Sequence, residues 1–217
     1  MGASNCLPMS RDDRLGYMPD ELTGTQEVRL VPLDEEHLPD VATMVADADV
    51  VRFTRFPEPL PPGFVARWYA RYQDGRVDGT CAAFAIVDAA GAFLGLALAP
   101  HIDGEAKEAE LGYMLAPTAR GRGIATEALR QLSDWAFRTL GARRLQLLIS
   151  VDNRASSRVA ERAGFLHEGV LRSLHVKQGL RSDTEMWSLL PSDARIKIGP
   201  DETPHFWVRL RGTSVSF

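Results

Sequence analysis

The stretch LGYMLAPTARGRGIATEALRQL, residues 111–132, contains the features that decide the fold. Apolar residues run up to Leu115, Pro117 ends the extended segment, and Gly121 and Gly123 precede a regular helical pattern. Glycine lets an anion approach the backbone closely, and the first N–H groups of a helix have no partner within the helix. The order of strand, glycine-rich turn and helix therefore predicts a site for a phosphate or pyrophosphate group.

A glycine-rich turn without any ligand is the competing interpretation, because so short a pattern also arises by chance. The turn differs from the nucleotide fingerprint Gly-x-Gly-x-x-Gly and from a phosphate loop that ends in Gly-Lys-Ser/Thr. The sequence around the turn must therefore decide between the two interpretations.

Apolar periodicity on both sides of the turn predicts one α/β domain with a mixed, mainly antiparallel central sheet. Strands are expected at 28–33, 81–88, 93–102, 108–117, 145–151, 169–176 and 184–190. Helices are expected after Asp34, from Phe64, over 122–140 and over 153–164. The proline-rich residues 52–63 are expected to form an irregular loop, because proline cannot continue a helix.

Composition narrows the function classes. The chain has 217 residues, of which 45% are hydrophobic and 25% charged, as in soluble folded domains. A net charge of −4 argues against nucleic acid as the main partner. No segment approaches the roughly 18 apolar residues of a membrane span, and no secretory signal is evident, so we expect a cytoplasmic protein without a membrane partner.

Cysteine and histidine give no sign of a metal or a disulfide framework. Cys6 and Cys81 are the two cysteines, and Cys81 lies in an apolar run that is typical of a core strand. The five histidines are scattered along the chain without the close pairing of a zinc site, so no metal is expected.

Three segments are predicted along the chain. Residues 1–25 lack helical or strand periodicity and are expected to be a flexible head. Residues 26–191 carry the periodic pattern of the domain. Residues 192–217 contain the alternating runs IKI and FWVRL, which could form a hairpin on the domain or a contact in a dimer.

Two further motifs carry a resemblance to a known family. EAELGYMLAP (108–117) leads into the glycine-rich turn, and NRASSRVAERAGF (153–165) follows one helix and one strand later. Together with the turn, they resemble the GNAT superfamily of N-acetyltransferases, in particular the branch of the ribosomal-protein-alanine N-acetyltransferases. The resemblance covers roughly residues 27–190. It implies a GNAT-type sheet whose fourth and fifth strands splay apart, so that the arm of acetyl-coenzyme A enters between them.

The resemblance also implies which residues bind acetyl-coenzyme A, here a co-substrate. The pantetheine arm is expected along Leu111, Gly112, Tyr113, Met114 and Leu115. The pyrophosphate is expected at Arg120, Gly121, Arg122, Gly123, Ile124, Ala125 and Thr126. Asn153 is expected to contact the coenzyme arm.

Glu110 and Ser156 are the catalytic candidates that the resemblance implies. Glu110 matches a glutamate that removes the amine's proton in parts of the family, while a solvent-facing strand residue is the alternative. Ser156 matches a serine that can protonate the leaving thiolate. Asn153 and Ser156 also fit an ordinary helix N-terminus. Ala160 occupies a position where many members outside this branch have a tyrosine acid, so Ser156 or water must serve instead.

The acceptor side is the least determined part of the site. The proline-rich loop shapes the acceptor cleft in the family, and residues there and beyond the last turn could read an acceptor's charge, although a solvated loop is an equal alternative. Phe53 and Phe56 are the loop aromatics that would shape the cleft. The residues that could read charge are Arg52, Arg55 and Glu58 in the loop, and Asp183 and Glu185 beyond the last turn.

The function implied is transfer of acetyl from acetyl-coenzyme A to a primary amine by direct attack in a ternary complex. A protein N-terminus, an aminoglycoside, an amino acid and a polyamine all remain open as acceptors. The alternatives are a non-catalytic module that binds or senses acyl-coenzyme A, and a transferase that uses another acyl-coenzyme A. A homodimer is left open as well.

Overall fold

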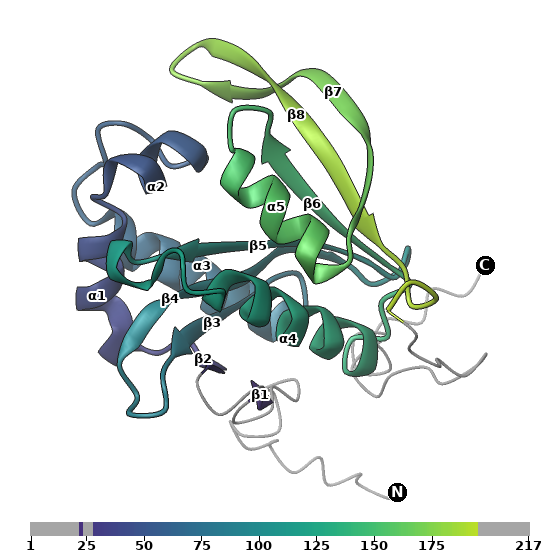
Figure 1. The fold of residues 1–217 in the computed structure, drawn as a ribbon. Coiled ribbons are helices and arrows are strands. Elements are labelled where there is room, and N and C mark those ends of the chain that lie inside the picture. The colour runs from purple at the N-terminus through teal and green to yellow at the C-terminus, as the bar shows by residue number, and fades with distance from the viewer. Residues whose placement is uncertain (1–21, 24–27, 195–217) are drawn as a thin grey trace, which may run out of the picture.

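The computed structural model describes residues 22–23 and 28–194 (Figure 1). The strands are β1 (Leu22–Thr23), β2 (Arg29–Pro32), β3 (Ala82–Val87), β4 (Phe93–Asp103), β5 (Glu108–Leu115), β6 (Arg144–Ser150), β7 (Leu166–Lys177) and β8 (Leu180–Leu189). The α-helices are α1 (Leu38–Met44), α2 (Ala48–Phe53), α3 (Phe64–Asp78), α4 (Ile124–Arg138) and α5 (Arg154–Ala163). Short 3₁₀ turns lie at Glu35–His37 and Pro117–Ala119.

These strands form one sheet in the order β1-β2-β3-β4-β5-β6-β8-β7. Every neighbouring pair is antiparallel except β5 and β6, which are parallel. A parallel pair needs a long crossover, and α4 supplies it. The predicted mixed, mainly antiparallel sheet is confirmed, and the fourth and fifth strands of the sequence prediction are β5 and β6.

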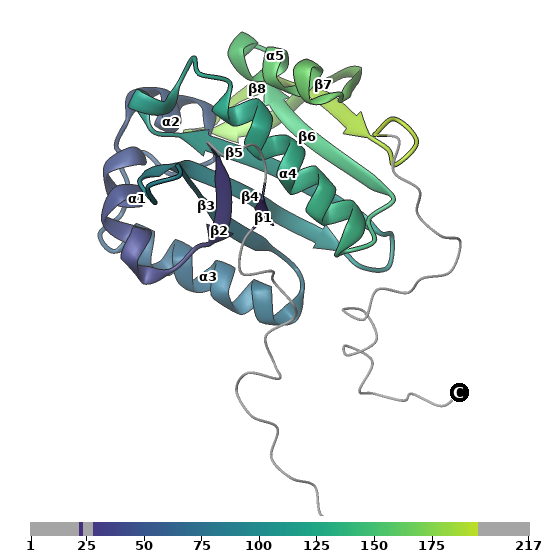
Figure 2. The same ribbon diagram turned by 60° about the horizontal axis from the view of Figure 1, so that its bottom comes forward.

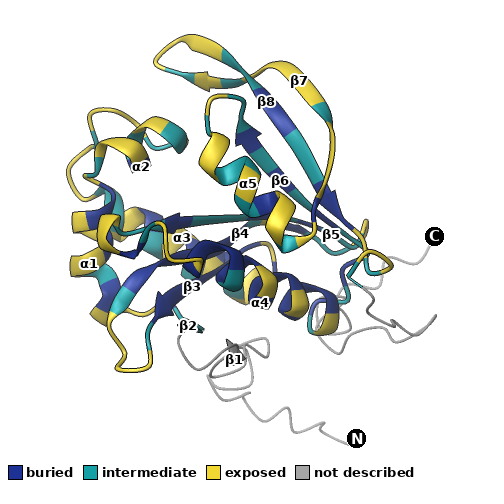
Figure 3. Cartoon of the chain, viewed as in Figure 1, coloured by how far each residue is buried: buried dark blue, intermediate teal, exposed yellow. Residues whose placement is uncertain are grey.

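Helices cover both faces of the sheet. Figures 1 and 2 show α4 and α5 on one face and α1 and α3 on the other. All six residues of β3 are therefore buried, as the dark blue ribbon of Figure 3 shows. Phe84 meets Trp135 of α4 edge-on with ring centroids 5.1 Å apart, while Ala83 and Ala85 belong to the core under α1 and α3. A strand buried on both faces is apolar throughout rather than alternating.

The predicted helices are confirmed with small shifts at their ends. Asn153 caps α5, whose first residue is Arg154, and Gly164 ends it. The helix predicted over 122–140 spans Ile124–Arg138, and its apolar stripe is buried. The helix predicted after Asp34 begins as a 3₁₀ turn that the Asp34 side chain caps, and continues as α1.

Two expectations need correction. Arg52 and Phe53 lie in α2 rather than in an irregular loop, because the Asp47 carboxylate accepts a hydrogen bond from the Val50 N–H and starts a helix ahead of the prolines. Leu22–Thr23, within the predicted flexible head, pairs with β2. The rest of the head and the runs IKI and FWVRL lie outside the described residues, so the three-segment organisation stays a prediction.

Over residues 22–23 and 28–194, no helix is long and apolar enough to cross a membrane. Cys81 is a free, buried cysteine, as its apolar context predicted. Burial raises the pKa of its thiol, so the thiol is a poor nucleophile at neutral pH.

Glycines on β4 and β5 give a matched test of this packing. A Cβ added at Gly95, where φ is +156°, would lie 2.2 Å from the Met114 carbonyl oxygen. Gly95→Ala should therefore lower the free energy of unfolding by about 2–3 kcal/mol and the melting temperature by roughly 5–10 °C in thermal denaturation. At Gly112, across from Leu98 of β4, a Cβ would meet no described atom within 4 Å. Gly112→Ala should melt within about 2 °C of the wild type, and equal losses in the two variants would contradict this packing.

Candidate active site

The strands β5 and β6 separate partway along their length. Among the described residues, they pair only where Glu108–Glu110 meets Arg144–Gln146. Beyond Glu110, β5 continues to Leu115 and β6 to Ser150 without pairing, and a cavity of about 650 Å³ lies there. The predicted splay is confirmed, and we name this cavity the interstrand cavity.

The interstrand cavity brings together most of the residues that the sequence assigned to coenzyme and catalysis. Its lining includes Glu110, Leu111, Gly112, Tyr113, Met114, Leu115, Arg120, Gly121, Ala125, Asn153 and Ser156. Of the residues predicted to contact the acceptor, the lining includes Phe53, Arg55 and Phe56. Arg122 and Gly123 are exposed just outside this lining.

A β-bulge lies at the point of separation. The register of β4 against β5 shifts between Leu98, opposite Gly112, and His101, opposite Glu110. Two residues of β4, Ala99 and Pro100, therefore face the single residue Leu111. Bulges bend a strand and increase its twist, and proline has no N–H to donate to a ladder. The bulge thus accounts for β5 turning away from β6 directly after Glu110.

The N-terminus of α4 lies beside this opening. Gly123 precedes the helix with φ +81° and provides no side-chain cap. A Cβ added at Gly121 or Gly123 would meet no described atom within 4 Å. Uncapped N–H groups at the positive end of a helix dipole attract anions, so this end of α4 suits a pyrophosphate.

Ile124 and Thr126 contribute differently from the glycines. Both side chains are buried, and the Thr126 N–H already donates to the Gly123 carbonyl at 3.0 Å. Among the residues predicted to bind the pyrophosphate, the exposed backbone of the two glycines and the first N–H groups of α4 are best placed for an anion.

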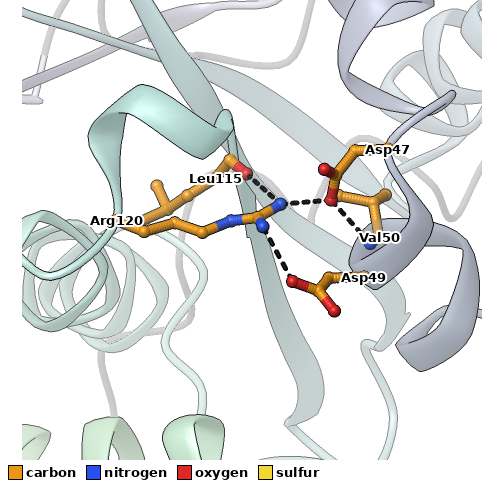
Figure 4. Close-up of polar contacts among 5 residues, drawn as sticks. All are labelled: Asp47, Asp49, Val50, Leu115 and Arg120. Atoms are coloured by element: carbon orange, nitrogen blue, oxygen red, sulfur yellow. Dashed lines mark hydrogen bonds and ion pairs between the residues drawn. The ribbon is translucent and has the colours of Figure 1, made fainter.

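Arg120 contacts carboxylates rather than facing open space (Figure 4). Its guanidinium donates to the carboxylate of Asp47 at 2.5 Å and to that of Asp49 at 3.0 Å, and to the Leu115 carbonyl at 3.3 Å. These bonds join the end of β5 to the first turn of α2. The hydrogen bond from Arg120 lowers the pKa of Asp47, against the opposing effect of desolvation.

Glu110 faces the interstrand cavity, with 19% of its side chain exposed. Its nearest charged partner is Arg55, with 3.8 Å between the guanidinium and the carboxylate. The solvent-facing alternative would leave Glu110 outside the cavity, whereas the structure places its side chain in the lining.

Ser156 has a partner that sequence reasoning missed. The hydroxyls of Tyr113 and Ser156 are 2.7 Å apart and share a hydrogen bond. Burial raises the pKa of Tyr113 to about 12, so this pair keeps its protons at neutral pH. Asn153 accepts a hydrogen bond from the Ser156 N–H at 3.1 Å, which confirms its capping role. Position 113 was assigned for its backbone alone, and no local sequence signal links it to residue 156.

Asp183 is not brought to the site. It lines neither of the two cavities described here, and its carboxylate accepts a hydrogen bond from the Ser173 N–H at 2.8 Å. Its strand neighbours Ser182 and Thr184 do line a cavity, because successive residues of β8 face opposite sides. Asp183 therefore stays a predicted acceptor contact that lies outside both cavities.

A second cavity, of about 550 Å³, adjoins the first and is lined partly by residues that the sequence did not single out. Among them are His175, Lys177 and Arg181 of the β7–β8 hairpin, together with the predicted Arg52. Within the described residues, no group of three or more His, Cys, Asp or Glu side chains is placed to hold a metal ion.

Comparisons with known proteins identify the family. Residues 27–166 match the family described as the acetyltransferase (GNAT) domain. Over 100 residues the chain is 36% identical to YdaF of Bacillus subtilis (strain 168), named as a ribosomal N-acetyltransferase. The matched stretch is 46% of this chain and 55% of YdaF. Over 150 residues it is 27% identical to the spermidine N(1)-acetyltransferase of Escherichia coli (strain K12), which covers 69% of this chain and 78% of that protein.

The fold is shared with solved acetyltransferase structures. The ribosomal L7/L12 alpha-N-protein acetyltransferase RimL, in complex with coenzyme A, matches with a TM-score of 0.72 at 23% identity, over 78% of this chain and 97% of that chain. The chain spans about half the length of the curated relatives that it matches at 33–36% identity. The family match covers the diverging strands and the glycine-rich turn, and this chain belongs to the GNAT acetyltransferase family.

Proposed function

We propose that this protein is an N-acetyltransferase that passes acetyl from acetyl-coenzyme A to a primary amine within a ternary complex. The observation that carries the proposal is the separation of β5 and β6 directly after Glu110, beside the uncapped start of α4. That arrangement offers free strand backbone for an extended arm and a helix N-terminus for its phosphates. The RimL structure with coenzyme A, which has the same fold, supports the choice of coenzyme.

The protein's residues can supply each proton transfer. The amine nitrogen bonds to the acetyl carbon, the carbon–sulfur bond breaks, and Glu110 takes up the amine's proton. Ser156 passes a proton to sulfur and regains one from water through the Tyr113 hydroxyl, so that the hydroxyl pair ends the step protonated. A backbone N–H of residues 112–114 would stabilise the charge on the carbonyl oxygen. Near pH 7, only about one α-amine in ten is neutral, so a base beside the acceptor increases the reactive fraction.

The alternatives are open to direct test. Release of free thiol from acetyl-coenzyme A only when an amine is present would separate a transferase from a non-catalytic binding module. Comparison with succinyl-coenzyme A would identify the acyl donor. A cytoplasmic location, a lack of nucleic-acid and membrane partners, and a homodimer all stay predictions, and sedimentation would decide the last.

The coenzyme site can be tested at Gly123, with Gly91 as a matched control. Both have positive φ, +81° and +86°, and a Cβ at either would meet no described atom within 4 Å. Gly123→Val and Gly91→Val should therefore cost similar backbone strain. Only Gly123→Val should weaken acetyl-coenzyme A binding, by about tenfold or more in calorimetry, because its side chain would fill the proposed phosphate position. Unchanged affinity in a folded Gly123→Val protein would exclude this site.

Substitutions at Arg120 and Arg122 should distinguish an arginine that joins β5 to α2 from one that contacts the coenzyme phosphates. In Arg120→Ala, the pKa of Asp47 should rise toward its ordinary value of 3.8, measured by NMR titration. The stabilisation is present above 3.8 and is lost as pH falls through the lowered pKa of Asp47, so the two proteins should converge in stability in acid. Arg122 is exposed, and Arg122→Ala should weaken coenzyme binding without moving Asp47. An unmoved Asp47 titration in Arg120→Ala would contradict the role of Arg120 in joining β5 to α2.

Glu110→Gln and Ser156→Ala should give different pH profiles. Glu110→Gln should lower kcat by roughly 10²–10⁴ near neutral pH, and the loss should shrink as pH rises and the free amine becomes neutral. Ser156→Ala removes a proton donor to sulfur, so high pH should not rescue it. Steady-state kinetics with an amine that supports turnover measures both effects.

Two controls sharpen this test. Glu108→Gln changes the same residue type two positions earlier on β5, outside the cavity, and should keep wild-type kinetics. If Tyr113 acts through Ser156, Tyr113→Phe combined with Ser156→Ala should be little worse than Ser156→Ala alone. Wild-type profiles in both Glu110→Gln and Ser156→Ala would leave catalysis to positioning alone.

A further inference from the structure

The second cavity lies between the α2 region and the tip of the β7–β8 hairpin, which Figure 1 shows facing each other across the top of the sheet. The tip is bonded to the opposite side: Lys177 donates to the Val51 carbonyl, and Gln178 donates to the Glu58 carbonyl at 3.4 Å. We name it the hairpin cavity. Because two walls far apart in sequence are bonded together, its shape is set by the fold rather than by a single loop.

The hairpin cavity adjoins the interstrand cavity at Glu110's end of the site. Phe53, Arg55, Leu148 and Ser150 line both cavities. Arg55 also lies 3.8 Å from Glu110, the proposed base. A molecule in the hairpin cavity can therefore present an amine to the interstrand cavity, whereas the α4 end of that cavity is reserved for the phosphates of the coenzyme.

The charged side chains that line the hairpin cavity are mostly cationic. Arg52, Arg55, Lys177 and Arg181 oppose the carboxylates of Glu58 and Asp152. The surplus of four cations over two carboxylates is +2. Lys177 pairs with Glu58 at 3.9 Å, a carboxylate already counted, whereas Arg55 pairs at 3.8 Å with Glu110, which lies outside this lining and reduces the surplus to +1. Arg52 and Arg181 are the cations of this lining without a carboxylate among their described partners. The described contacts of Arg52 are a cation–π approach to Phe53, at 4.9 Å, and no carboxylate.

His175 lies beside two of these same cations. It is half-buried in the hairpin cavity, and its pKa is lowered first by desolvation and then by the charges of Arg55 and Lys177. Burial and, second, the neighbouring cations thus favour the neutral imidazole, and those cations would also repel any other cation placed beside it.

We infer that the hairpin cavity binds the acceptor and selects an amine that carries a carboxylate or phosphate group, in preference to a polyamine. This inference rests on the proposed transferase function and names its substrate class. Arginine forks pair with carboxylate and phosphate oxygens, so Arg52 and Arg181 would hold the anionic group while the amine points toward Glu110. A polyamine brings further cations into a cationic cavity, and like charges disfavour the wrong partner.

Four acceptors test the inference with the full chain and acetyl-coenzyme A. Three peptides begin with alanine and differ only at the next two positions, Asp-Asp, Asn-Asn or Lys-Lys, and the fourth acceptor is spermidine. From thiol release, kcat/KM for the Asp-Asp peptide should exceed that of the Asn-Asn peptide by about tenfold and those of the Lys-Lys peptide and spermidine by more. The preference should weaken as salt is added. O-phosphoserine compared with serine shows whether phosphate serves as well as carboxylate.

Arg52→Glu should reverse this order, lowering kcat/KM for the Asp-Asp peptide by about tenfold and raising it for the Lys-Lys peptide. Arg138→Glu is the matched control, because it makes the same change in net charge at an exposed position of α4 that pairs with Asp134. Its acceptor preference should equal the wild type's. A wild-type preference for the Lys-Lys peptide or spermidine, or an Arg52→Glu profile like that of the wild type, would overturn the inference.

Binding measurements distinguish failure of this inference from failure of the proposed function. If no acceptor releases thiol, the transferase proposal fails, and calorimetry of the same peptides in the presence of coenzyme A then decides the cavity's chemistry. Tighter binding of the Asp-Asp peptide, abolished by Arg52→Glu and kept in Arg138→Glu, would uphold an anion-selective cavity. Equal or weaker binding of that peptide would exclude one.

Discussion

The site depends on a single interruption of backbone pairing. A parallel pair in the middle of a sheet normally satisfies its N–H and C=O groups along its whole length, and unpaired buried groups are costly. Here β5 and β6 share a ladder only from Glu108 to Glu110, and the remainder of β5 faces a cavity. On one face, α4 packs on β5, α5 packs on β6, and the two helices contact each other, so this helix pair spans the gap. The backbone that the gap leaves open is what an extended ligand arm can use.

The bulge and Arg120 fix the two ends of that opening. At one end, Ala99 and Pro100 face the single residue Leu111 and turn β5 away. At the other end, Arg120 binds two carboxylates of the α2 region as well as the carbonyl of Leu115, the last residue of β5. The sequence assigned Arg120 to the coenzyme because of its place in the turn. In the structure, its side chain connects the end of β5 to the helix that carries Arg52 and Phe53, a contact that its place in the turn did not predict.

Sequence periodicity predicted where the helices and strands lie. It did not predict which way a side chain faces or which side chain it contacts. The apolar spacing over 122–140 and the Asn153 cap located α4 and α5 to within two residues. The prolines of residues 52–63 led to the prediction of a loop from Arg52 onward. The Asp47 cap instead starts a helix, α2, that includes Arg52 and Phe53 and ends before the first proline. Asp183 lies outside both cavities while Ser182 and Thr184 line one, because neighbouring residues of a strand face opposite sides and a residue's place next to a strand does not fix its side. The Tyr113–Ser156 bond joins residues 43 positions apart, so only the folded chain reveals it.

The distribution of charge along the site follows from which elements meet there. The start of α4 contributes an uncapped dipole end, and the hairpin cavity contributes guanidinium groups, so both ends of the site favour anions. Glu110 is the carboxylate between them, and Arg55 holds it within 3.8 Å while lining both cavities. An acceptor anchored by its anionic group at one end, and a donor anchored by its phosphates at the other, would meet at this carboxylate. Attraction at both ends would then position the two reactants, with Glu110, the proposed base, between them.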